Sequence, residues 1–158
     1  MKYYNSIAEG YDELYREEQT KKIELIKKYL KVKKSDYLLD VGTGTGIALE
    51  FFDCRKIGID PSKELLKKAK VPVICSKAEK IPFKDKTFDV AISVTAIQNF
   101  DDIEKGLKEI KRVCKGAVAL TFLKKSKKRD EIVELINKYF KIDKEIEEEK
   151  DLIFIGRV

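Results

Sequence analysis

The sequence predicts an α/β fold built on a mostly parallel sheet, and three observations lead to this prediction. Short apolar segments alternate with segments of helical periodicity along nearly the whole chain. Three closely spaced glycines follow the first apolar segment, where a strand gives way to a helix. Two last strand-like segments, joined by an acidic turn, end the chain. Repeated strand–helix–strand units place parallel strands in one sheet with helices on both of its faces.

The first half of the chain supplies three of the expected strands. Residues 18–32 form an amphipathic helix with Ile23, Ile26 and Leu30 on one face. Strands are then expected at 37–41, 56–59 and 71–75, and helices at 46–52 and 62–70. Pro72 lacks a backbone donor, which restricts the third strand to the sheet edge or places Pro72 near the strand's start.

The second half continues the alternation. Strands are expected at 88–93, 117–122, 142–146 and 152–158, and helices at 101–115 and 130–140. Asp101 and Glu104 are typical of a capping box at the start of the first of these helices. The seven strands predict a Rossmann-like, doubly wound sheet, mostly parallel with an antiparallel last strand. No repeat, linker or low-complexity segment interrupts residues 1–158, which we interpret as a single domain.

The composition is that of a globular protein. Of the 158 residues, 43% are hydrophobic and 39% charged, and no apolar run is long enough to cross a bilayer. The first ten residues lack the apolar core of a signal peptide. Cys54, Cys75 and Cys114 show no C-x-x-C spacing, so we expect small core hydrophobes and neither a zinc site nor disulfides. Together these features predict a cytoplasmic protein with no membrane partner.

The charge pattern carries little functional information by itself. The net charge is +6, but lysine and glutamate are interleaved, as on solvated helix faces. Asparagine and glutamine are scarce, which is a thermophile-like composition. The chain contains no histidine. Mechanisms that need an imidazole base or a histidine metal ligand are therefore excluded, and no spacing of acidic residues suggests a metal site.

The stretch LLDVGTGTGIALEFF, residues 38–52, places Gly42, Gly44 and Gly46 at alternate positions. Glycine inside a regular element costs about 0.5–1 kcal/mol relative to alanine, so the run needs positive φ angles or a backbone without Cβ atoms. The usual reason is a ligand that lies directly on the main chain. In a doubly wound sheet, ligands bind beyond the carboxyl ends of the strands, where this run is expected to lie.

Two acidic residues at the ends of the first two strands narrow the ligand to a nucleoside. Asp60 follows Asp40 by twenty positions, and its carboxylate can accept hydrogen bonds from both hydroxyls of a ribose. NAD is disfavoured, because Ile47 stands where the dinucleotide fingerprint G-x-G-x-x-G has its last glycine. Asp40 would also repel a pyrophosphate, whereas it suits a ligand that carries an ammonium and a sulfonium.

Further motifs, taken in order, resemble the class I S-adenosylmethionine-dependent methyltransferases, specifically their type 11 group. LLDVGTGTG resembles the first motif of that family and IGIDPS the second. AEKIPFKDKTFDVAISVTAIQNFDD is similar to the family's A-E-x-L-P-F and S-F-D pattern, and YNSIAEGYDELY to its lead-in. The resemblance covers nearly the whole chain and implies S-adenosyl-L-methionine as the cofactor.

The resemblance also implies roles for individual residues. Asp40 would lie near the methionine end of the cofactor, Asp60 would hold the ribose hydroxyls, and the backbone amide of Ala78 would face the adenine edge. Capping roles are the alternatives for both aspartates, and ordinary packing in an amphipathic core is the alternative for Tyr4 and Tyr11. The full set of implied contacts is Asp40, Gly42, Thr43, Gly44, Gly46, Asp60, Pro61, Ala78, Glu79, Ser93 and Thr95, with Ala96 or Ile97 opposite Pro61 on the adenine and Tyr4 and Tyr11 closing over the site.

Two departures from the family pattern affect the site. Lys77 stands where the family has an aspartate that accepts from the adenine amino group, and lysine has no acceptor. Either Glu79 substitutes for it, or the adenine edge is bound by the backbone alone. The loop SVTAIQNF is not of the N-P-P-Y type, which argues against methylation of adenine N6 or of glutamine.

The expected activity is methyl transfer by in-line displacement to an unidentified acceptor. The chain has no insertion after the fifth strand, which leaves residues 1–20 as the expected lid. An open site suits a macromolecular acceptor (RNA or protein), an anionic small molecule, or a cover supplied by a homodimer or a partner subunit. The basic run Lys124, Lys125, Lys127, Lys128 and Arg129 is either a solvated loop or a contact for an anionic acceptor. The alternative function is a cofactor-binding partner or regulatory subunit without activity of its own.

Overall fold

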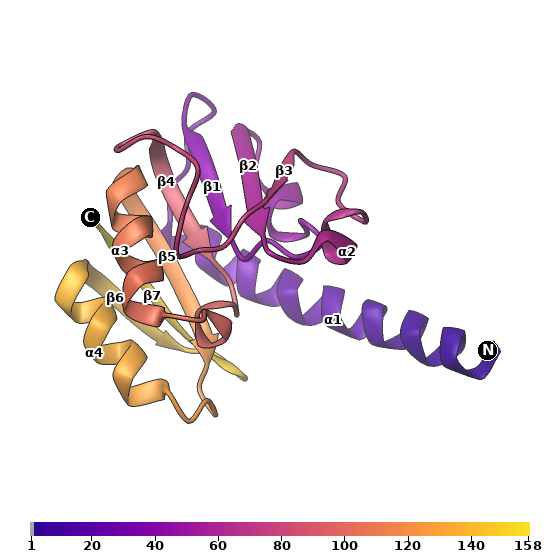
Figure 1. The fold of residues 1–158 in the computed structure, drawn as a ribbon. Coiled ribbons are helices and arrows are strands. Elements are labelled where there is room, and N and C mark those ends of the chain that lie inside the picture. Colours follow the sequence, from indigo (N-terminus) through magenta and orange to yellow (C-terminus); the bar gives the residue numbers. More distant parts are fainter. Residues whose placement is uncertain (1) are drawn as a thin grey trace.

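The computed structural model describes the backbone of residues 2–158 and the side chains of residues 13–158. Its centre is a seven-stranded sheet with helices on both faces (Figure 1). The strands are β1 (Tyr37–Val41), β2 (Arg55–Asp60), β3 (Val73–Cys75), β4 (Phe88–Ser93), β5 (Cys114–Leu123), β6 (Lys141–Glu147) and β7 (Asp151–Arg157). The helices are α1 (Lys2–Tyr29), α2 (Lys63–Leu66), α3 (Ile103–Val113) and α4 (Arg129–Tyr139), with the 3₁₀ helices η1 (Ala48–Phe51) and η2 (Ile97–Asn99).

The strand order is β3-β2-β1-β4-β5-β7-β6. Strands β1 to β5 pair in parallel, whereas β7 runs antiparallel to both β5 and β6. This arrangement confirms the predicted α/β fold, a Rossmann-like sheet that is mostly parallel with an antiparallel last strand. The chain winds outward from β1 to β3 and then returns to β4 beside β1. The carboxyl ends of β1 and β4 therefore flank the crevice in which sheets of this kind bind ligands.

The core has two layers, one on each face of the sheet. Helices α3 and α4 cover one face with buried residues such as Leu107 and Ile136. Helix α1 and η1 cover the other face, where Ile23, Ile26 and Leu49 are buried. The two layers are visible on either side of the strands in Figure 1. The apolar stripe predicted within residues 18–32 is thus confirmed as the side of α1 that packs on the sheet.

Two of the predicted helices are much shorter than expected. The range 46–52 contains only η1, because Gly46 has a φ of 79° and the loop is still turning there. The range 62–70 contains only α2, which Ser62 caps by accepting from the backbone amide of Leu65. No residue of α2 is buried, and a short helix without packing is marginal in water.

Two smaller predictions are also wrong. The N-cap of α3 is Asp102, whose carboxylate accepts from the amide of Lys105 at 3.1 Å; Asp101 is free to point elsewhere. Of the three cysteines only Cys114 is buried, while Cys54 is half-buried and Cys75 exposed on the edge strand β3. The apolar pattern of residues 71–75 does not show whether the strand is central or at an edge of the sheet. The sequence therefore could not predict that Cys75 is exposed.

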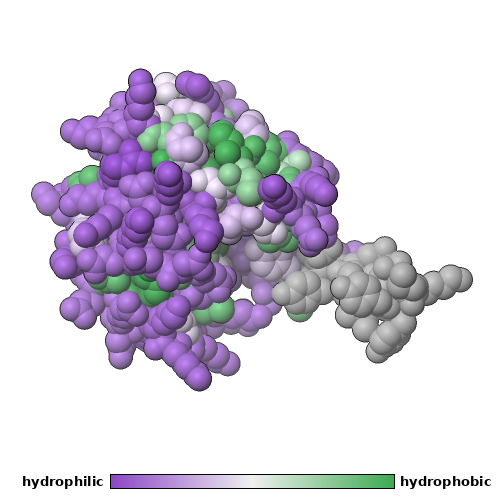
Figure 2. Space-filling view, viewed as in Figure 1, coloured by the Kyte–Doolittle hydropathy of each residue, from purple (hydrophilic) through white to green (hydrophobic). Residues whose placement is uncertain are grey.

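The surface is mostly polar. Hydrophilic side chains cover most of the face in Figure 2, and the largest hydrophobic area on it lies over the β2–β3 side of the sheet. Within the described residues, no helix combines the length and apolarity needed to cross a membrane. The same part of the chain contains no group of three or more acidic or cysteine side chains placed to hold a metal ion.

Candidate functional site

The loop after β1 explains the glycine spacing. Gly42, Gly44 and Gly46 all have positive φ, at 78°, 57° and 79°, in the left-handed region that other residues rarely adopt. The loop is fixed to the next strand, because the amides of Gly42 and Thr43 both donate to the carbonyl oxygen of Ile59 at 2.9 Å. The main chain therefore turns sharply at the carboxyl end of β1.

The three glycines differ in what surrounds them. A Cβ on Gly42 would lie 2.5 Å from the Cβ of Ala96, and one on Gly46 would lie 2.7 Å from Cγ2 of Val71. At Gly44 the nearest atom would be 3.9 Å away. Gly42 and Gly46 thus permit close packing within the protein, whereas Gly44 leaves an open stretch of backbone beside a cavity.

Asp60 joins the two loops that flank the cavity. Its Oδ2 accepts from the amide of Gly44 at 2.9 Å, and its Oδ1 accepts from the amide of Ser62 at 2.8 Å. The residue is 9% exposed and lines the cavity. Because each carboxylate oxygen has a second lone pair, both can still accept from a ligand. Asp60 therefore caps its own turn and also offers acceptors to a bound group.

Asp40 is buried and only half satisfied. Its Oδ2 accepts from the hydroxyl of Thr43 at 2.8 Å, whereas Oδ1 has no hydrogen-bond partner. Burial raises the pKa of Asp40 from 3.8 to about 7; the Thr43 hydroxyl opposes this shift and the charge of Asp60 adds to it. Asp40 lines a small recess that shares Gly42 and Tyr15 with the main cavity. A cationic group in this recess would meet an unpartnered oxygen.

The main cavity has a volume of about 270 Å³ and lies at the carboxyl ends of β1, β2 and β4. Eight of the residues singled out from the sequence line it: Gly42, Gly44, Asp60, Pro61, Ala78, Glu79, Thr95 and Ala96. Asp40 and Thr43 line the adjoining recess. The residues named from the sequence thus converge on one site, although their individual contacts with a cofactor stay predictions.

Other predicted residues lie elsewhere. Ser93 is fully buried, and its hydroxyl donates to the carbonyl oxygen of Val41 at 2.8 Å, so it ties β4 to β1 and does not line the cavity. Ile97 is likewise buried and does not line the cavity, whereas Ala96 and Pro61 both do. The side chains of Tyr4 and Tyr11 lie outside the described residues.

At the rim of the cavity, Lys77 forms an ion pair with Asp101. Its Nζ lies 2.9 Å from Oδ2 of Asp101, and this hydrogen bond, before all other causes, raises the pKa of Lys77. Glu79 Oε2 accepts from the amide of Asp102 at 2.9 Å. Asp101 itself lines the cavity and brings a carboxylate to the edge where the family pattern has one at position 77.

Some residues that line the cavity are not among the contacts implied by the sequence: Tyr15, Leu65, Ser76, Lys77, Val94, Asn99, Phe100 and Asp101. Asp101 and Asp102 are adjacent, and the sequence does not show which of the two caps helix α3. The prediction of Asp101 as the cap therefore left no role for it at the cavity. Tyr15 is the last residue of the lead-in YNSIAEGYDELY, and the motif itself does not distinguish it from Tyr4 and Tyr11. It lies on α1 and borders both the cavity and the recess.

The fold and the site define an α/β domain built to bind a nucleoside-containing ligand. Residues 39–122 match the family model described as a methyltransferase domain, and the chain belongs to that family. S-adenosylmethionine is accordingly its cofactor.

The chain is also similar to individual proteins. An uncharacterised protein of Methanocaldococcus jannaschii is 38% identical over 119 residues, which cover 72% of this chain and 46% of that protein. A ubiquinone/menaquinone biosynthesis C-methyltransferase of Geotalea uraniireducens is 35% identical, covering 60% and 49%. A Haloferax volcanii protein, solved in complex with the Trm112 methyltransferase activator, shares the fold with a TM-score of 0.79 at 17% identity and 94% coverage of both chains. The chain spans about half the length of the curated relatives it matches.

The residues present fit this cofactor. The unpartnered Oδ1 of Asp40 lies in a recess where an ammonium group could supply the missing donor. The open backbone at Gly44 is a surface that a Cβ would fill. Asp60 retains acceptor capacity toward the cavity for the two hydroxyls of a ribose.

Proposed function

We propose that this domain uses S-adenosylmethionine to methylate an acceptor that binds at the mouth of the cavity. The observation that carries the proposal is the pair of acidic side chains at the ends of β1 and β2, one of which has a buried oxygen without a partner. The cofactor supplies a methyl group on a sulfonium, which is reactive by itself. The task of the protein is to hold this group in line with the acceptor.

In this proposal the chain's residues bind and orient. Asp40 attracts the ammonium of the methionine end, and Asp60 accepts from the ribose. Pro61 and Ala96 enclose the adenine, whose edge meets the backbone of Ala78 and the rim carboxylate of Asp101. Such alignment can supply about 7–11 kcal/mol of a barrier without a general base. The absence of histidine is compatible with this kind of catalysis.

The acceptor is proposed to be a group that ionises readily, such as a phenol, a thiol or a carboxylate. The cavity, at about 270 Å³, is at the small end of ligand pockets, so the acceptor must bind largely outside it. Tyr15 and Asn99 line the cavity and could contact such an acceptor. The similarity to a C-methyltransferase of quinone biosynthesis favours the phenol among these groups, because an ionised phenol makes a ring carbon nucleophilic. A macromolecular acceptor is the other outcome of the test below.

We propose further that residues 1–158 act as one cytoplasmic domain with residues 1–20 as part of its cover. The position of Tyr15 at the cavity supports this role for α1. A partner subunit could complete the cover, as suggested by the activator bound to the Haloferax volcanii protein. A homodimer would serve the same purpose.

A second candidate is a cofactor-binding subunit without activity of its own. The observation that favours it is Lys77, which stands where the family pattern has an aspartate and whose ammonium group pairs with the carboxylate of Asp101. Both candidates require cofactor binding, so binding alone does not separate them. They differ in whether a methyl group leaves the protein.

The experiment uses calorimetry followed by a transfer assay. The purified chain should bind S-adenosylmethionine and S-adenosylhomocysteine at one site and should not bind NAD. It is then incubated with methyl-labelled cofactor and separated small-molecule, RNA and protein fractions of a cell extract. Label in the small-molecule fraction supports the proposal, and label in RNA or protein identifies a macromolecular acceptor. Tight binding of NAD would overturn the assignment, and cofactor binding without any labelled acceptor would favour the second candidate.

A further inference from the structure

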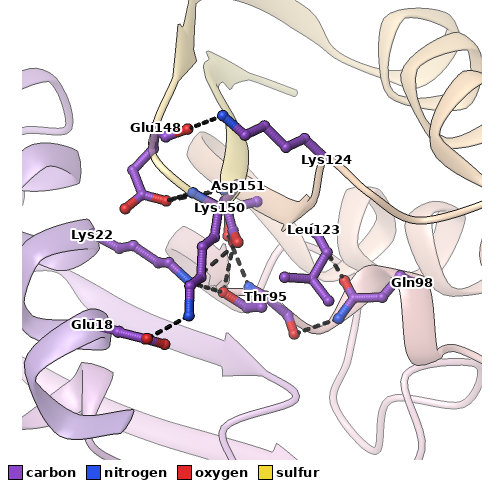
Figure 3. Close-up of polar contacts among 10 residues, drawn as sticks. Glu18, Lys22, Thr95, Gln98, Leu123, Lys124, Glu148, Lys150 and Asp151 are labelled. Atoms are coloured by element: carbon purple, nitrogen blue, oxygen red, sulfur yellow. Dashed lines mark hydrogen bonds and ion pairs between the residues drawn. The ribbon is translucent and has the colours of Figure 1, made fainter. Parts of the chain in front are cut away.

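A buried ion pair lies next to the cavity but does not line it. Nζ of Lys22, on α1, is 3.1 Å from Oδ1 of Asp151, the first residue of β7. The exposed fractions of the two side chains are 2% and 0%. Two segments at opposite ends of the chain thus meet at the carboxyl edge of the sheet (Figure 3).

Both charged groups converge on Thr95. The hydroxyl of Thr95 donates to Oδ2 of Asp151 at 2.6 Å and accepts from Nζ of Lys22 at 3.2 Å. Its amide donates to the hydroxyl of Thr121 at 2.8 Å, and its carbonyl oxygen accepts from the amide group of Gln98 at 2.8 Å. The hydroxyl of Thr121 also donates to Oδ2 of Asp151 at 2.8 Å. Every polar group of Thr95 is therefore held, as Figure 3 shows for the labelled residues.

The backbone of Thr95 needs to be held. Its φ is 54°, and among the non-glycine residues that the structure describes only Lys86 shares a positive φ. A β-branched residue is strained in this region and keeps it only where its surroundings impose it. The contacts of Lys22, Asp151, Thr121 and Gln98 are those surroundings.

The conformation of Thr95 sets one wall of the cavity. Thr95 and Ala96 both line it, and Ala96 packs so closely on Gly42 that no Cβ would fit between them. If Thr95 relaxed to a negative φ, the chain after β4 would change direction and Ala96 would leave the glycine loop. The shape of the cofactor site therefore depends on one strained residue.

We propose that Lys22 and Asp151 are positioning residues of the cofactor site, which act by holding Thr95 in its left-handed conformation. The inference rests on the proposed function, since it assigns the role to the cofactor cavity. Helix α1 would then have two roles at the cavity, because it carries both Tyr15, which lines the cavity, and Lys22, which holds Thr95. Seating of α1 and the shape of the site are thereby coupled.

A purely structural role makes a different prediction. Replacing both members of a buried ion pair with apolar residues of similar shape is often neutral or stabilising, because it leaves no unpaired charge. The double variant Lys22→Met/Asp151→Leu keeps the length of the lysine stem and the branching of the aspartate. It removes both contacts to the hydroxyl of Thr95. If the pair positions Thr95, this variant should keep its stability but lose cofactor affinity. If the pair has only a structural role, cofactor affinity should not fall while stability is kept.

The chain offers a matched control. Glu18 and Lys150 form a second ion pair between α1 and the turn before β7, one helical turn from Lys22 and one residue from Asp151. This pair is partly exposed and does not contact Thr95. The control variant Glu18→Gln/Lys150→Met removes an ion pair between the same two segments without touching the loop after β4.

The experiment measures the dissociation constant of S-adenosylhomocysteine by calorimetry for both double variants, with thermal unfolding as the check of folding. We expect Lys22→Met/Asp151→Leu to weaken binding about tenfold or more, and the control to change it less than about twofold. In a Thr95→Gly background, where positive φ is unstrained, the same double substitution should weaken binding less than about threefold. A folded Lys22→Met/Asp151→Leu variant that binds as tightly as the control would overturn the proposal.

Two further readouts keep the test decisive. If the double variant does not fold, Thr95→Val removes both contacts between the hydroxyl and the ion pair while keeping the pair and the β-branched shape, and unchanged binding in it would also overturn the proposal. Amide hydrogen exchange of residues 94–98 needs no cofactor: it should be faster in Lys22→Met/Asp151→Leu than in the control. If the unaltered protein binds no S-adenosylhomocysteine, the proposed function fails. Unchanged exchange, by contrast, contradicts the positioning role itself.

Discussion

The two walls of the cavity are held by different kinds of contact. The wall at β1 and β2 is made of backbone: the glycine loop bonds to Ile59, and Asp60 accepts from the amides of Gly44 and Ser62. The wall at β4 is held by side chains from distant segments, with Thr95 bound by Lys22 and Asp151. The first wall is a local structure that one stretch of sequence encodes, whereas the second exists only once the whole sheet has assembled.

The largest effect is expected on the backbone wall. Gly42→Ala would place a Cβ 2.5 Å from that of Ala96 at a φ of 78°. We expect a loss of about 3 kcal/mol or more in the free energy of unfolding and loss of measurable cofactor binding. Gly44→Ala is the control for strain without a clash, because its Cβ would lie 3.9 Å from Cδ1 of Leu65, an ordinary van der Waals contact. It should cost only about 1 kcal/mol of stability. Equal losses in the two variants, measured by denaturant unfolding, would contradict this account of the loop.

Asp60 tests whether that wall also binds the ribose. Asp60→Ala removes the acceptors of two backbone amides and of any bound hydroxyls, so cofactor affinity should fall at least about tenfold. Stability should fall as well, by about 1–3 kcal/mol, because two partly buried donors lose their partner. Calorimetry and denaturant unfolding measure the two effects. A stability loss with unchanged affinity would assign Asp60 to turn capping alone.

Asp40 gives the backbone wall a dependence on pH. Its pKa is raised to about 7 in the folded protein, mainly by burial, so between about pH 4 and 7 the folded state binds more protons than the unfolded state. The contribution of Asp40 to stability is therefore greatest below about pH 4 and is lost as the pH rises through about 7. Asp40→Asn should flatten this part of the profile, measured as denaturation midpoints from pH 5 to 8.

The same group should link proton release to cofactor binding. A cationic group in the recess favours the ionised carboxylate, so affinity for S-adenosylmethionine should rise with pH up to about 7 and the complex should release protons below it. Calorimetry in buffers of different ionisation enthalpy measures this release. Asp53→Asn, at an exposed carboxylate, is the control. A proton release that persists in Asp40→Asn would place the titrating group elsewhere.

The smallest effect is expected at the rim. Lys77 and Asp101 are both largely exposed, and exposed ion pairs contribute little. Lys77→Met should therefore change cofactor affinity less than about threefold. Lys77→Asp should tighten binding slightly if the added carboxylate reaches the adenine amino group, and should weaken it if repulsion from Asp101 dominates. A large loss in Lys77→Met would show that the lysine contacts the cofactor directly.

The difference between the walls also explains how much the sequence could predict. The strand–helix alternation, the glycine loop and the two aspartates follow from short stretches whose spacing has few physical explanations. Gly42, Gly44 and Asp60 are examples, and all three line the cavity, whereas Gly46 packs against Val71. The residues that form this wall belong to short motifs of the sequence.

The other wall gave no such signal. In the sequence, Lys22 is one of many lysines on a helix, and Asp151 is part of an acidic turn. Their pairing could not be predicted, because the two residues lie near opposite ends of the chain. Ser93 was misplaced for a related reason: alternation along β4 does not tell which polar residue faces a neighbouring strand. The lengths of the short helices also depended on packing that no local pattern records.

The most direct test of the central claim is a crystal structure of the protein grown with S-adenosylhomocysteine. The account predicts the ribose hydroxyls within about 3 Å of the Asp60 carboxylate and the ammonium group at Oδ1 of Asp40. The adenine should lie between Pro61 and Ala96, with Thr95 still at positive φ. A nucleoside bound away from the glycine loop, or one whose ribose does not reach Asp60, would contradict it.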